Sequence, residues 1–193
     1  MLLFDPFKIQ MQVKAFFIGL IAAFFLLLPN YAGASTQEYS VKAVFLFHFI
    51  DFVSWPEEKN KQEIRNICIY GNDPFDSRLQ LLAESGLQQI PVRILPEINL
   101  VSSSECHILF VGSSMRKQLD QIISYLANSP ILTVSDIDDF ALNRGMIGFT
   151  IEAGKVKLEV NIDSVKASGI KLSSNLIEIA KVVKSPSNSG KEK

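Results

Sequence analysis

Apolar positions along the chain alternate between short runs rich in β-branched residues and longer stretches with helical spacing. The strand-like runs occupy residues 67–70, 90–95, 107–111 and 131–134. Two intervening stretches have apolar residues three or four positions apart: Phe75, Leu79, Leu82 and Ala83, then Met115, Leu119, Ile122, Ile123 and Leu126. Asp73 and Pro74 are expected to start the first of these helices. Strands that alternate with helices predict a parallel sheet covered on both faces.

The pattern changes towards the C-terminus. Residues 146–151 and 156–162 flank a turn at 152–155 and predict a β-hairpin, with Glu159 and Asn161 on its polar side. A final helix is predicted through Val183, with one apolar face: Leu172, Leu176, Ile179, Ala180 and Val183. We therefore predict an α/β fold, with a mostly parallel sheet flanked by helices and an antiparallel C-terminal hairpin at one edge.

A nearly apolar helix is predicted from Val41 to Trp55 and ends before Pro56. At about fifteen residues it is too short to span a bilayer, which takes about 20 apolar residues. Packing against the sheet is its simplest role, and contact with another protein is the alternative.

The N-terminus has the pattern of a secretory signal. Lys8 and Lys14 precede an apolar run of 14 residues, Ala15 to Leu28, and residues 32–34 have the small-x-small pattern of a cleavage site. We expect residues 1–34 to be a signal peptide cleaved after Ala34, with Met1 or Met11 as the start and a periplasmic location for the product. An uncleaved N-terminal anchor is the alternative.

The length and composition of the chain after the signal are those of one ordinary domain. We expect this domain over residues 35–184, followed by a disordered polar tail at 185–193. The whole chain has 193 residues, with 19 Lys and Arg against 20 Asp and Glu. Such balanced charge gives no field that would attract a phosphate backbone, so no nucleic-acid partner is expected.

Residues suited to catalysis are few. His48 and His107 are the only imidazoles, neither belongs to a G-x-S-x-G motif, and His107 is interpreted as a buried core residue. Cysteines and histidines lack zinc-site spacing, and the residues Asp136, Asp138 and Asp139 are interpreted as a capped short helix rather than a calcium loop. We therefore expect no enzymatic activity, no metal and no cofactor.

Loops after two predicted strands are candidates for a ligand crevice at the carboxyl ends of the sheet. The residues concerned are Gly71, Asn72, Gly112, Ser113 and Ser114. Backbone N–H groups of the second loop, Gly112 to Ser114, could hold a small anion at the start of a helix, although helix capping explains this loop more simply. This crevice supports the alternative function of a periplasmic small-ligand carrier.

Cys68 and Cys106 are the only cysteines, and export would place both in an oxidising compartment. If the sheet has the flavodoxin-like order 2-1-3, both cysteines fall on neighbouring strands, near the same end. A disulfide is then geometrically reasonable, and a pair of buried thiols is the alternative.

Several motifs, taken in order, resemble the YfiR family. They are FHFIDFVSWP at 47–56, ICIYGNDPF at 67–75, CHILF at 106–110, GMI at 145–147, LEVN at 158–161 and SGIKLSSNL at 168–176. The resemblance covers nearly all of the chain after the signal. It implies a Rossmann-like α/β domain in which the cysteines at positions 68 and 106 pair.

The resemblance also implies a function. The family consists of small periplasmic proteins without known catalysis, and its namesake represses an inner-membrane diguanylate cyclase through that enzyme's periplasmic portion. We therefore expect an inhibitor of such a cyclase or related sensor, which lowers cyclic-di-GMP signalling and biofilm formation, and which could act as a homodimer. The candidate partner-binding residues lie on the first helix and near the last one: Phe45, Phe49, Phe52, Trp55, Leu172 and Leu176.

The chain departs from the family pattern in three ways. A second cysteine pair that some members carry near the hairpin is absent. Arg144 replaces a glycine, and His48 replaces a small or amide residue. Redox sensing assigned to that second pair therefore does not transfer to this chain.

Overall fold

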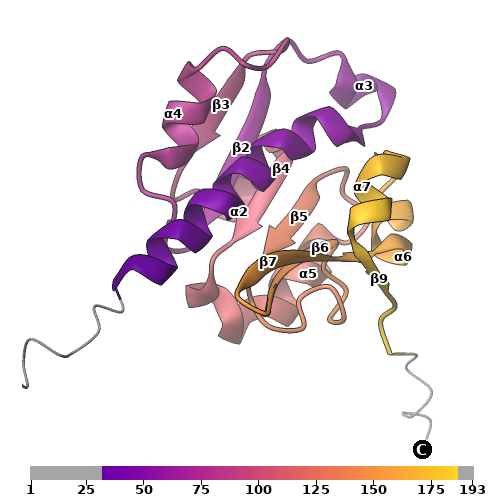
Figure 1. Ribbon diagram of the computed structural model, residues 1–193. Helices are drawn as coiled ribbons and strands as arrows, with labels where there is room; N and C mark the ends of the chain where they lie inside the picture. Colours follow the sequence, from indigo (N-terminus) through magenta and orange to yellow (C-terminus); the bar gives the residue numbers. More distant parts are fainter. Residues whose placement is uncertain (1–31, 187–193) are drawn as a thin grey trace, which may run out of the picture. The chain divides into compact units, whose positions relative to one another are not determined.

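The computed structural model describes residues 32–186 (Figure 1). The chain divides into two compact units, residues 1–35 and 36–193, and the second contains the fold described below. Most of the predicted signal peptide lies outside the described residues, as do residues 187–193 of the predicted tail. Within the described part, no helix has the length and apolar character needed to cross a membrane.

The sheet has seven strands in the order β3-β2-β4-β5-β6-β7-β9. Their bounds are β2 Arg65–Tyr70, β3 Val92–Leu95, β4 Ile108–Val111, β5 Leu132–Ser135, β6 Ile147–Glu152, β7 Lys155–Asn161 and β9 Lys181–Val183. β3, β2, β4, β5 and β6 are parallel, β6 and β7 form the antiparallel hairpin, and β9 runs parallel to β7. The predicted α/β class and the order 2-1-3 of the first three strands are confirmed.

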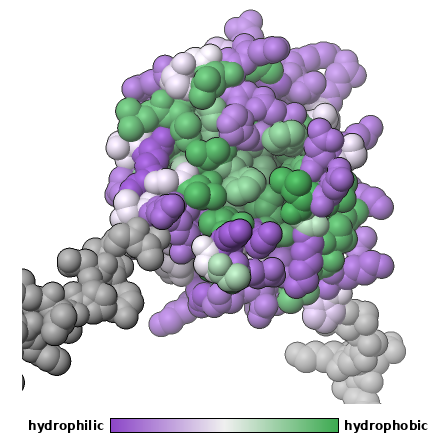
Figure 2. All heavy atoms as spheres, viewed as in Figure 1, coloured by the Kyte–Doolittle hydropathy of each residue, from purple (hydrophilic) through white to green (hydrophobic). Residues whose placement is uncertain are grey.

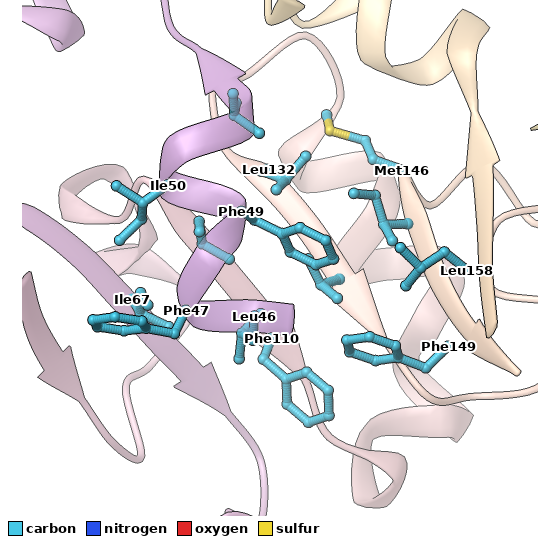
Figure 3. Packing of buried hydrophobic residues seen from close by; sticks show 14 of the residues in the cluster. Leu46, Phe47, Phe49, Ile50, Ile67, Phe110, Leu132, Met146, Phe149 and Leu158 are labelled. Carbon is cyan, nitrogen blue, oxygen red and sulfur yellow. The ribbon is translucent and has the colours of Figure 1, made fainter. Parts of the chain in front are cut away.

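Helices cover both faces of this sheet. On one face lies the long helix α2 (Ala32–Phe52), together with α4 (Arg78–Glu84). α2 buries Leu46, Phe47 and Phe49 against the sheet, as Figure 3 shows. The other face is covered by the 3-10 helix η2 (Ser113–Gln118) and α5 (Leu119–Leu126), whose predicted apolar stripe packs on β4.

The first helix differs from its prediction at both ends. It begins at Ala32 and stops at Phe52, because Val53 and Ser54 form a short strand, β1, that pairs with β8 (Lys171–Leu172). The Ser173 N–H donates to the Phe52 carbonyl at 2.8 Å, which ties the helix end to the C-terminal segment. Trp55 therefore lies beyond the helix, just before α3 (Glu57–Asn60).

The single C-terminal helix predicted through Val183 is wrong. Two short helices, α6 (Ile162–Ala167) and α7 (Ser174–Ile179), flank β8, and the chain then enters β9. Asn161 and Ser173 cap α6 and α7 by accepting from backbone N–H groups at 3.1 and 3.3 Å, and these caps break the helical run. Because β9 adds to β7, the hairpin is next to the edge of the sheet and does not form it.

Glu159 and Asn161, predicted on the polar side of the hairpin, are both buried. Glu159 accepts a hydrogen bond from Lys181 of β9 at 2.9 Å, and the Asn161 amide donates to the Ala141 carbonyl and to Ser185 Oγ, both at 2.8 Å. Alternation identified the strand correctly, but segments distant in sequence cover its second face. Ser185, the first residue of the predicted tail, is thus held by a side-chain hydrogen bond.

Two local helix predictions also need correction. Asp73 accepts from the Phe75 N–H at 2.7 Å and so caps a turn, while α4 begins only at Arg78. Residues 136–139 do not form a short helix: position 136 has irregular backbone, a bend and a turn follow it, and Asp139 has a positive φ of 58°. At the second place the local backbone bond is to Ser135, whose Oγ accepts from the Ile137 N–H at 3.0 Å. In both places a side-chain oxygen therefore satisfies a tight turn rather than the first turn of a helix.

Cys68 and Cys106 form a disulfide across the face of the sheet covered by α5. Cys68 lies in β2 and Cys106 directly precedes β4, the parallel neighbour of β2, and their Cα atoms are 5.8 Å apart. The pairing implied by the family resemblance is confirmed.

Candidate functional site

The outward side of α2 is apolar. Val41 and Val44 are exposed, Val44 by 45% of its surface, and Phe45 and Phe52 are half-buried. These four side chains, with Gln37, Ser40 and His48, line a shallow hollow of about 530 Å³. Their spacing of three or four residues places them along one stripe of the helix. α2 is therefore apolar on two sides, one packed on the sheet and one exposed.

The predicted partner-binding residues divide between these two sides. Phe49, Trp55 and Leu176 are buried in the core, where their side chains stabilise the fold. Phe45, Phe52 and Leu172 remain partly exposed. Of the six predicted residues, only Phe45 and Phe52 line the hollow.

The apolar surface extends beyond α2 onto the sheet. Phe45 contacts Phe149 of β6, with ring centroids 6.3 Å apart. Ile151 lies two residues further along β6, on the same face of the sheet as Phe149, and is 48% exposed. Val182 of β9 pairs with Val160 of β7, which faces α2, and is also 48% exposed. We call Val41, Val44, Phe45, Phe52, Ile151 and Val182 the apolar face, and Figure 2 shows apolar residues gathered across this side of the molecule.

Polar groups border the apolar face at one end. Asp51 Oδ2 accepts from Gln88 Nε2 at 2.9 Å and lies 3.1 Å from His48 Nδ1. Both His48 and Asp51 are substantially exposed, and their side-chain hydrogen bonds in the described part of the chain are to each other and to Gln88 rather than to a Ser or Cys nucleophile. The pair is arranged as part of a polar rim around apolar surface, which is the usual anatomy of a protein–protein interface.

The predicted ligand crevice brings two loops together. The Asn72 N–H donates to Ser114 Oγ at 3.0 Å, and a Cβ added to Gly112 would lie 2.7 Å from the Asn72 carbonyl oxygen. Gly71 has a φ of +93°, and a Cβ there would lie 2.6 Å from Ser114 Oγ. The two glycines thus allow the two loops to pack closely on each other. Ser113 lines a separate cavity, which is described below.

His107 is fully buried between basic neighbours. Its Nδ1 accepts from the Asn66 N–H at 3.1 Å, so its proton lies on Nε2, which faces the Lys59 carbonyl at 3.4 Å. The pKa of His107 is lowered to about 4, mainly by burial; the hydrogen bond to the Lys59 carbonyl acts in the opposite direction, and the positive charges of Arg65 and Lys59 add to the lowering. A neutral, fully hydrogen-bonded imidazole beneath Trp55 is a structural residue, as the sequence indicated.

Sequence reasoning missed the sheet portion of the apolar face. Ile151 and Val182 fall in segments predicted as a strand and a helix, and their spacing is that of ordinary core residues. The sequence did hold one signal, because a first helix of about fifteen residues is too short to cover one face of the six strands that the sequence predicts. Within the described residues, no three His, Cys, Asp or Glu side chains come together in a way that could hold a metal ion.

Comparison with known proteins places this geometry in context. The sequence profile of a family described as YfiR/HmsC-like matches residues 39–181. An ABC domain from Streptococcus pneumonia, solved in complex with L-Trp, is similar in structure with a TM-score of 0.50 and 9% identity, over 77% of this chain and 60% of that one. A conserved domain protein from Vibrio cholerae O1 biovar eltor gives a TM-score of 0.48 and 8% identity, over 76% and 60%. The chain thus spans about 60% of each of these structures, and the first shows a shared α/β fold.

Proposed function

This chain belongs to the YfiR/HmsC-like family, and we propose that it is a periplasmic regulator that inhibits an inner-membrane diguanylate cyclase or a related sensor. Members of this family are known as periplasmic regulators. In this proposal the signal peptide is removed after Ala34, and the protein binds the periplasmic portion of its membrane partner without catalysing a reaction. Cyclic-di-GMP output would fall when the protein is bound.

One observation carries the proposal, namely the apolar face. Exposed apolar surface that extends over several elements, here α2, β6 and β9, and is bordered by polar groups is typical of a binding surface rather than of a monomer's solvated side. A helix is also well suited to enter a groove of a partner through residues at spacings of three, four and seven. Val41, Val44, Phe45, His48 and Phe52 have this spacing along α2.

The regulator has to bind one state of its partner more tightly than the other. A differential affinity of about 1–3 kcal/mol changes the output of a two-state enzyme roughly 5- to 150-fold. Burial of a few side chains is sufficient, because each fully buried Val or Phe contributes about 1.5–3 kcal/mol. The apolar face therefore has enough side chains to supply this difference.

The proposal is tested with a charged substitution on the apolar face. Val44→Glu places a carboxylate in the middle of the exposed stripe of α2, and we expect it to abolish co-purification of the membrane partner from crosslinked cells. The matched control is Tyr125→Glu on α5, an exposed apolar residue (53%) on the opposite face of the sheet. The control should keep the partner, and both variants should melt at the wild-type temperature.

Cellular cyclic-di-GMP provides the functional readout. Deletion of the gene should raise it, the wild-type protein and Tyr125→Glu should restore it, and Val44→Glu should not. Restoration by Val44→Glu would show that inhibition does not use this face. Unchanged cyclic-di-GMP on deletion would contradict the cyclase-inhibitor function itself.

A further inference from the structure

A second cavity lies where β5 ends. β5 and β6 pair over only two positions, Val134 with Ile147 and Ser135 with Gly148, and β6 then continues to Glu152 while the chain turns away after Ser135. The space beside this part of β6 is a cavity of about 470 Å³, closed on another side by the first turns of α2. Its volume is in the range of small-molecule sites, and it lies at the carboxyl end of parallel strands, where α/β sheets commonly bind ligands.

Carboxylates dominate the lining of this cavity. They are Glu38, Asp136, Asp138, Asp139 and Glu159, and Lys42 is the one cationic side chain among the lining residues. Asp138 and Glu159 have their own surface partners, Arg116 and Lys181, both at 2.9 Å. Negative charge in excess therefore remains on the side of α2.

Asp136 is the centre of that excess. Its side chain is 7% exposed, and its Oδ2 accepts from Lys42 Nζ and from the Tyr39 hydroxyl, each at 2.9 Å. Lys42 also pairs with Glu38 at 2.5 Å, so one ammonium group is shared by two carboxylates. Burial, together with the hydrogen bond to Asp136, raises the pKa of Tyr39, which keeps its hydroxyl a donor. The group of three charged side chains carries a net charge of −1 in a largely buried position.

Two oxygens at this cavity have no hydrogen-bond partner. Across the described residues, three buried side-chain oxygens have none, and two of them, Asp136 Oδ1 and Thr150 Oγ1, belong to residues that line this cavity. An unsatisfied buried acceptor is costly, and a buried carboxylate oxygen more so. Both the unbalanced charge and the missing donors indicate that a cationic hydrogen-bond donor completes the site.

We propose that this cavity binds a small organic cation through an ammonium group, the class represented by aliphatic diamines. An ammonium group donates up to three hydrogen bonds and neutralises the net charge around Asp136. A second ammonium group can lie near the exposed Asp139. A divalent metal ion is less suited, because no three carboxylates of the described residues are placed to coordinate one. The inference concerns the purified protein alone, so it stands or fails separately from the proposed membrane partner.

Isothermal titration calorimetry of the purified protein with 1,4-diaminobutane tests the proposal. We expect saturable one-to-one binding at low salt, and no binding of 1,4-butanediol, which has the same length without charge. Asp136→Asn should weaken the affinity by about tenfold or more, because it removes the buried charge that the ammonium group balances. The control Asp120→Asn, on the exposed side of α5, should bind like the wild type.

A second variant keeps the test valid if Asp136→Asn fails to fold. Asp139→Asn is exposed, and its positive φ of 58° is tolerated by asparagine, so it should keep the melting temperature while binding the diamine about threefold or more weakly. The proposal is overturned if the diamine does not bind, or if it binds both Asp136→Asn and Asp139→Asn as it binds the wild type. Tighter competitive binding of CaCl2 or MgCl2 would also overturn it, in favour of a metal site.

Discussion

Acid should destabilise this protein through one residue, His107. The imidazole is buried beside Lys59 and Arg65, and burial lowers its pKa to about 4, from 6.5 in an exposed peptide. The folded protein therefore does not take up this proton until the pH reaches about 4, whereas the unfolded chain takes it up near pH 6.5. Because the unfolded state binds more protons in this window, the free energy of unfolding falls as the pH is lowered through it.

The size of the effect follows from the two pKa values. Each unit of difference corresponds to about 1.4 kcal/mol, so the full loss between neutral pH and pH 4 is about 3 kcal/mol, of which about 2 kcal/mol is lost by pH 5. A domain of this size is stable by only about 5–15 kcal/mol, which makes such a loss easy to measure.

Urea denaturation of the wild type and of His107→Gln at pH 7.5 and pH 5 isolates this contribution. The variant loses stability at pH 7.5 because it disturbs the hydrogen bonds to Asn66 and Lys59, but its side chain cannot titrate. Its deficit relative to the wild type should therefore shrink by about 2 kcal/mol at pH 5. His48→Gln, at the only other histidine, controls for loss of an imidazole on the surface. A deficit of His107→Gln that is equal at both pH values would refute this reasoning.

Four further predictions concern stability, each checked by urea denaturation. Cys68→Ser should lower the free energy of unfolding by about 4 kcal/mol, since the disulfide closes a loop with a separation of 38 residues, and reduced wild type should match the variant. Lys59→Met should raise the free energy of unfolding near pH 7, because burial lowers the pKa of Lys59 to about 8 and so the charged form is unfavourable in the folded protein. The free energy of unfolding of the wild type should rise towards that of the variant as the pH rises from 8 to 10.5. Asn161→Ala should lower the free energy of unfolding by about 3 kcal/mol, since it removes a helix cap and two hydrogen bonds of a buried amide. If Asn161 were a surface residue, as the alternation suggested, the loss would be under about 0.5 kcal/mol. Gly145→Ala should cost about 2 kcal/mol or more, because its Cβ would lie 2.3 Å from the ring of the buried Phe140, and an unchanged midpoint would show that the ring can move aside.

The central sheet could be predicted because its strands carry their own signals. Continuous β-branched runs such as 67–70 and 131–134 mark strands buried on both faces, and the intervening stripes of apolar residues mark the helices that cover them. Short connections and right-handed crossovers then leave few possible strand orders, so the order that places Cys68 next to Cys106 was accessible before the structure.

The C-terminal part could not be predicted in the same way. Its apolar residues are compatible with one helix, and the break into α6, β8, α7 and β9 depends on partners far away in the sequence: Val53 for β8 and β7 for β9. Local propensity is a weak preference that such tertiary contacts override. The burial of Glu159 and Asn161 has the same cause.

Both candidate sites depend on what covers a surface, which periodicity does not encode. The sequence by itself determined that the helix containing Phe45 and Phe49 is apolar nearly all round, because residue type and spacing are local properties. Only the tertiary structure decided that Phe49 is core and Phe45 lines a hollow, and that Asp136 is buried opposite Lys42 with an oxygen left without a donor. The physical reason is that burial and charge balance depend on neighbours from distant parts of the chain. Lys42 and Asp136, for example, are 94 residues apart in the sequence and meet only once the chain has folded.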